Sequence, residues 1–117
     1  VVTETMFGEG HWARAEGLPQ HLFDPQKAKQ LLDQAGFRDP DGDGPKTRFS
    51  LSYRTSTDAE AVQRGEMIQQ MLKVVGIDLK IQSNEFGTFY EAIGKGNFQM
   101  FSLSRNGLIS TLSTVAA

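Results

Sequence analysis

The strongest constraint on the fold is the spacing of apolar residues along residues 24–104, which changes repeatedly between the spacing of a helix and that of a strand. The first segment, residues 24–36, spaces its apolar residues as one face of a helix. Asp24 is a good N-cap, Pro25 suits the first helical position, and Gly36 is a typical C-terminal stop. The pattern predicts a helix here.

The apolar period then changes to two, which indicates strands. Residues 47–55 alternate Phe49, Leu51 and Tyr53 with polar side chains, and residues 77–83 repeat the alternation. A third strand is expected at residues 98–104. The alternation in the first two strands predicts one buried face. The other face is either open to solvent or covered by something absent from this chain.

Two further helices are expected between these strands. Thr57 and Glu60 match a capping box at the start of residues 57–76. Residues 84–96 place Phe86, Phe89 and Tyr90 at helical spacing. We expect these aromatic side chains to be core residues, with Phe86 in the first turn best placed to reach a cleft.

The resulting order is α-β-α-β-α-β, and strands separated by helices should be parallel with right-handed crossovers. We predict an α/β fold with a small parallel sheet in which the first strand lies between the other two. Residues 1–23 are expected to be an irregular arm or linker, residues 24–104 an α/β lobe, and residues 105–117 a loop or frayed tail. The open sheet face is one that a second copy of the chain could cover, as a homodimer.

Composition excludes several classes of function. The formal charge of −2 is interspersed along the sequence, so nothing indicates a nucleic-acid or membrane surface. No apolar run is long enough for a membrane span, and there is no cysteine for a disulfide, a thiolate zinc site or a nucleophile. No nucleophile with a neighbouring base is visible either, so we expect neither an enzyme nor a cofactor. The start lacks a methionine and a signal peptide, which predicts a piece of a longer protein.

The stretch "DPDGDG" leaves two interpretations open. Asp39, Asp41 and Asp43, followed by Gly44, match the beginning of an EF-hand calcium loop. The position that should carry a bidentate glutamate is Ser50, however, within a predicted strand. The other interpretation is a tight turn built by Asx-turns and glycines. A calcium-responsive interaction module is therefore the alternative function.

The candidate binding residues follow from topology, because ligands of open parallel sheets bind beyond the carboxyl ends of the strands. Polar and aromatic side chains gather after each predicted strand. The candidates are Tyr53, Arg54, Thr55, Ser83, Asn84, Phe86, Ser104, Arg105 and Asn106.

Several motifs in order carry a resemblance to a known family. The runs are "FDPQKAKQLLDQAGF", "DPDGDG", "LSYRTS" and "GEMIQQMLKVVGIDLKIQSNEFGTFYEAIGKGNFQMFSLS". Across residues 22–104 the chain resembles the peptide/nickel-type (family 5) extracellular solute-binding proteins of bacterial ABC transporters. The family's usual tryptophan at the start of the third helix is replaced here by Phe86.

The resemblance implies a fragment of the C-terminal lobe of a type II periplasmic-binding fold. It also implies a periplasmic, extracellular or lipid-anchored receptor that captures peptides or similar small polar solutes and delivers them to an ABC permease without catalysis. Arg105, with no acidic residue after it, would favour an anionic group on the solute.

Overall fold

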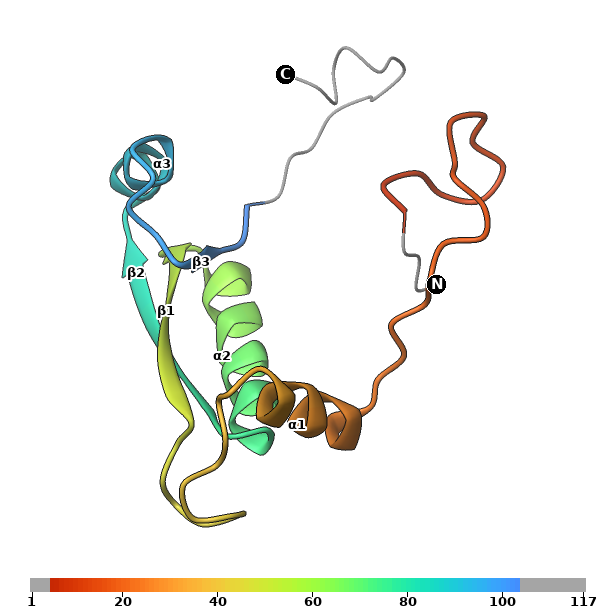
Figure 1. The fold of residues 1–117 in the computed structure, drawn as a ribbon. Coiled ribbons are helices and arrows are strands. Elements are labelled where there is room, and N and C mark those ends of the chain that lie inside the picture. Colours follow the sequence, from red (N-terminus) through yellow and green to blue (C-terminus); the bar gives the residue numbers. More distant parts are fainter. Residues whose placement is uncertain (1–4, 104–117) are drawn as a thin grey trace.

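A parallel sheet organises the computed structural model, which describes residues 5–103 (Figure 1). Along the chain the elements are α1 (Pro25–Gln34), β1 (Phe49–Ser56), α2 (Ala59–Val74), β2 (Ile77–Asn84), α3 (Phe86–Gly94) and β3 (Met100–Phe101). The strand order is β2-β1-β3, and both pairings are parallel. The predicted α/β class, element order and central position of the first strand are therefore confirmed.

The two long strands pair along their whole length. The register runs from Phe49 opposite Ile77 to Ser56 opposite Asn84, so both strands end at the same edge of the sheet. β3 pairs only with Tyr53 and Arg54. Polar side chains at the ends of β1 and β2 therefore share one edge of the sheet.

The core lies between α2 and one face of the sheet. Tyr53 is 0% exposed and Leu79 and Phe89 are each 1% exposed. Gly65 of α2 lies against the Tyr53 ring, and the Gln69 side-chain amide donates a hydrogen bond to the Leu79 carbonyl oxygen (2.7 Å). Helix α2 is thereby fixed to both β1 and β2.

Side-chain caps begin the helices, with one difference from the sequence prediction. Asp24 caps α1 by accepting a hydrogen bond from the Lys27 amide, as predicted. The predicted capping box of Thr57 and Glu60 is wrong, because the N-cap of α2 is Asp58, which accepts from the Ala61 amide. An ionised carboxylate accepts a stronger hydrogen bond than a hydroxyl, which favours Asp58 as the cap.

The third strand is shorter than the expected residues 98–104. Only Met100 and Phe101 form β3. On its N-terminal side the side-chain oxygen of Gln99 accepts the hydrogen bond from the Ser52 amide (2.7 Å). That side chain occupies the place that a further backbone pair would take. Residue 104 lies outside the described part of the chain.

The aromatic face of α3 is only partly buried. Phe89 enters the core, whereas Phe86 and Tyr90 are 55% and 58% exposed. The expectation that all three are core residues is therefore wrong for Phe86 and Tyr90. Their rings stack on each other at a centroid distance of 5.9 Å.

Arg48, just before β1, connects several parts of the fold through its side chain. Its side chain is 3% exposed. It donates hydrogen bonds to the carbonyl oxygens of Val75 (2.9 Å) and Phe37 (2.7 Å) and to the carboxylate of Asp33. One guanidinium group therefore connects α1, the loop after it and the end of α2.

Residues 5–23 contain no helix or strand and extend away from the α/β body (Figure 1). Within this arm the His11 ring stacks with the rings of Phe7 and Trp12, at centroid distances of 4.4 and 5.8 Å. In the described part of the chain no helix is long and apolar enough to cross a membrane.

Candidate solute-binding edge of the sheet

The carboxyl edge of the sheet is organised around Arg54. Its Nε–H donates to the carbonyl oxygen of Asn97 (2.6 Å) and its Nη1 to the side-chain oxygen of Asn84 (3.1 Å). Arg54 thus joins the ends of β1 and β2 to the turn after α3. A guanidinium group has five N–H donors, so it retains donors for a further acceptor.

Tyr53 and Thr55 do not share this environment. They alternate with Arg54 along β1 and point to the opposite face, where both are 0% exposed. Neither hydroxyl has a hydrogen-bond partner within the described residues. The structure therefore brings Arg54 and Asn84 together, whereas it buries Tyr53 and Thr55 behind them.

The two buried hydroxyls lead to a stability prediction. We expect Tyr53→Phe to leave the free energy of unfolding unchanged or to raise it by about 1 kcal/mol, because it removes a buried polar group without a partner. Thr55→Val, which preserves the shape of the side chain, should have the same effect on the free energy of unfolding. Urea unfolding followed by circular dichroism measures both effects.

Tyr90→Phe is the matched control for this prediction, because the Tyr90 side chain is exposed and its hydroxyl can reach water. Its stability should equal that of the parent chain. A loss of more than about 1 kcal/mol in Tyr53→Phe would show that the Tyr53 hydroxyl makes a stabilising hydrogen bond, contrary to the prediction.

Phe86 lies at the start of α3, directly after β2, and presents a largely exposed ring beside Tyr90. Glu85 caps this helix by accepting from the amides of Gly87 and Thr88. The carboxylate therefore occupies the helix N-terminus, and Phe86 supplies an apolar surface next to it. Ser83 also lies at this edge, opposite Thr55 in the register.

Three predicted site residues, Ser104, Arg105 and Asn106, lie outside the described residues. Two positions that were not among the predicted site residues lie at this edge instead. Asn97 contributes its carbonyl oxygen to Arg54, and Tyr90 extends the aromatic surface of Phe86. The signal for Tyr90 was its spacing of four residues from Phe86, which places both on one helical face.

The Asp/Gly loop turns the chain from α1 into β1, and its carboxylates have separate partners. Asp39 accepts from the Asp41 amide, Asp41 from the Lys46 amide (3.0 Å), and Asp43 from the Lys29 ammonium (2.6 Å). Hydrogen bonding and charge from Lys29 lower the pKa of Asp43 below its ordinary value. Among residues 5–103 no group of three or more acidic, histidine or cysteine side chains is placed to hold a metal ion.

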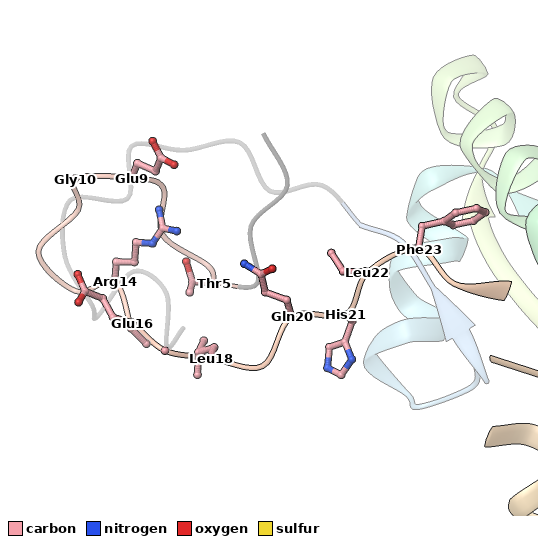
Figure 2. A pocket seen from close by; sticks show the side chains of 12 residues that line it. Thr5, Glu9, Gly10, Arg14, Glu16, Leu18, Gln20, His21, Leu22 and Phe23 are labelled. Carbon is pink, nitrogen blue, oxygen red and sulfur yellow. The ribbon is translucent and has the colours of Figure 1, made fainter. Parts of the chain in front are cut away.

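A separate hollow lies in the arm. It has a volume of about 910 Å³ and is lined entirely by residues between Thr5 and Phe23 (Figure 2). Figure 2 shows the labelled side chains spaced around an open loop of backbone. No residue of the sheet edge contributes to it, so it is separate from the candidate site.

The comparisons with known proteins define the class of the chain. The model of the family "bacterial extracellular solute-binding proteins, family 5 Middle" matches residues 1–114. The chain therefore belongs to this family of extracellular solute-binding proteins, as the resemblance indicated.

Two curated relatives have different solutes in their names. The chain is 32% identical over 105 residues to the nickel-binding periplasmic protein of Escherichia coli, covering 85% of the chain and 20% of that protein. It is 27% identical over 99 residues to the oligopeptide-binding protein AppA of Bacillus subtilis, covering 80% of the chain and 18% of that protein. The chain thus spans about a fifth of the length of these relatives.

Solved structures extend the comparison to the fold. NikA from Brucella suis in complex with Fe(III)-EDTA superposes with a TM-score of 0.75 at 28% identity, over 97% of this chain and 24% of that one. The periplasmic binding protein DppA from Helicobacter pylori in complex with the peptide STSA gives a TM-score of 0.61 at 28% identity, over 77% of this chain and 16% of that one. Both are periplasmic-binding folds, in agreement with the predicted α/β lobe.

Proposed function

We propose that this chain forms part of a receptor that captures peptides or other small polar solutes outside the cytoplasm and delivers them to an ABC permease. The role is binding without catalysis, and the segment contributes to the C-terminal lobe. The observation that carries the proposal is the family match over residues 1–114. The location is periplasmic or extracellular, which agrees with the family description and with the names of the relatives.

The geometry supports the carboxyl edge of the sheet as the binding surface. Arg54 and Asn84 are held in place by hydrogen bonds between them and to Asn97. The unused donors of Arg54 suit a carboxylate or carbonyl oxygen of a solute. The exposed rings of Phe86 and Tyr90 offer an apolar surface close to β2. A polar solute with an apolar part matches this combination.

The experiment is a nuclear magnetic resonance titration of the isotope-labelled chain with the tetrapeptide STSA. We expect weak, saturable changes in the amide signals of Asn84 to Phe86 and in the side-chain signals of Arg54. Binding should be weak because the chain spans only about a fifth of its relatives. Weak binding is visible to this method because fast exchange still shifts the signals.

Two variants make the titration specific. Arg54→Met should remove the response, whereas Arg64→Met, an exposed position on α2, should not change it. The amide spectrum of each variant without solute verifies that the fold is retained. Absence of any response at millimolar STSA, or a response confined to the Asp/Gly loop, would overturn the proposed site.

A further inference from the structure

The Asp/Gly loop contains two Asp-Gly peptide bonds whose chemical environments differ. They are Asp41–Gly42 and Asp43–Gly44, both in an exposed stretch between α1 and β1. Within the described residues neither glycine amide donates a hydrogen bond. An Asp-Gly bond is open to attack on the aspartate side chain by the following amide nitrogen, since glycine has no Cβ to obstruct it.

We propose that Asp41 is a site of spontaneous isomerisation to isoaspartate and that the ion pair between Lys29 and Asp43 protects the second Asp-Gly bond. The Gly42 nitrogen forms a bond to Cγ of Asp41, and a hydroxyl group leaves that carbon with the amide proton as water. The product is a five-membered cyclic imide.

Solvent water then opens the imide at one of its two carbonyl carbons. Attack at Cγ restores aspartate, whereas attack at the former backbone carbonyl gives isoaspartate, in which the main chain runs through the side chain. One water is lost and one is gained, so the mass is unchanged and nothing is oxidised or reduced.

The partners of the two carboxylates distinguish their reactivity. The imide forms from the neutral carboxyl group, because a carboxylate is a poor electrophile. The Lys29 ammonium contacts Asp43 at 2.6 Å, stabilises its anion and lowers its pKa. Asp41 accepts only a neutral backbone hydrogen bond, from the Lys46 amide at 3.0 Å. Asp43 therefore has less of the reactive form.

Isomerisation at Asp41 changes the loop itself. The main chain gains one methylene between residues 41 and 42, and the side-chain carboxylate that accepts from Lys46 is displaced. The loop leads to Arg48, whose side chain donates hydrogen bonds to the carbonyl oxygens of Val75 and Phe37. The product is therefore a chain whose connection between α1 and β1 is longer and less restrained.

The test is prolonged incubation of the chain at neutral pH and body temperature, followed by peptide mapping with an isoaspartate-specific methyltransferase and electron-transfer fragmentation. We expect isoaspartate at residue 41 to accumulate several-fold faster than at residue 43. In Lys29→Met the rate at residue 43 should rise several-fold while the rate at residue 41 stays unchanged. A synthetic peptide of residues 37–48, which lacks Lys29, should show similar rates at both positions.

Asp41→Glu is the chemical control, because a glutamate would need a less favourable six-membered ring and should lose the signal at residue 41. Circular dichroism of Lys29→Met verifies that the helix content is retained. Equal rates at residues 41 and 43 in the intact chain, or no effect of Lys29→Met on residue 43, would overturn the proposal. Absence of isoaspartate at both positions after several weeks would do the same.

Discussion

Replacing Arg48 by methionine should lower the free energy of unfolding by about 3 kcal/mol, because two carbonyl oxygens and the Asp33 carboxylate lose a common donor and Asp39 loses an ion-pair partner. Arg48 donates to Phe37 and Val75 and pairs with Asp33 and, at 3.9 Å, with Asp39. Methionine preserves much of the apolar volume of the arginine side chain. The loss therefore reports the polar contacts, and urea unfolding followed by circular dichroism measures it.

Two variants test whether the effect belongs to this geometry. Arg48→Lys keeps the charge but cannot reach acceptors on three sides, so we expect an intermediate loss. Lys46→Met changes an exposed cation two residues away and should alter stability by less than about 0.5 kcal/mol. An unfolding midpoint for Arg48→Met equal to that of the parent would contradict the importance of this group.

Arg48 also illustrates what the sequence could not predict. It precedes a strand within a polar stretch, where an arginine is ordinarily exposed. Its burial depends on α1, the loop and the end of α2 converging on one point, and no local pattern encodes that convergence. The helices and strands themselves were predictable, because each carries its own period and its own cap or stop residue.

The candidate site was predictable in outline but not in its details. The topology rule correctly places the ends of β1 and β2 at one edge, since both strands are parallel and in register. The same rule does not say which face each side chain occupies. Alternation along β1 turns Arg54 towards Asn84 and Asn97 and buries Tyr53 and Thr55. Helical spacing places Phe86, Phe89 and Tyr90 on one side of α3 but does not specify that only Phe89 is buried.

Gly65→Val should also destabilise the chain strongly, by about 3 kcal/mol or more. A Cβ atom at Gly65 would lie 2.9 Å from Cε1 of Tyr53 and 3.6 Å from Cδ1 of Ile81. The Tyr53 ring is fully buried, so it has no room to move aside. A glycine in the middle of a helix ordinarily weakens it, but here its small size lets α2 approach β1 closely.

Gly65→Ala and Gln70→Val separate the effect of helix propensity on stability from the effect of overpacking the interface. Alanine improves helix propensity by about 1 kcal/mol but overpacks the interface by about 1–3 kcal/mol, so the net change should be a small loss. Gln70→Val, on the exposed face of α2, should cost only about 0.5 kcal/mol for the β-branched side chain. If Gly65→Val lost no more stability than Gln70→Val, the close approach would not be a constraint.

A second substitution should identify the Tyr53 ring as the cause of the clash. Tyr53→Leu removes part of the buried ring and should itself be destabilising, because it leaves a cavity. Combined with Gly65→Val, however, the new side chain fills part of that cavity, and the double variant should be more stable than the sum of the single losses predicts. We expect a coupling free energy of about 1–2 kcal/mol, measured by a double-mutant cycle in urea. Strict additivity would mean that valine clashes with a group other than Tyr53, and the pairing of Gly65 with this ring would be wrong.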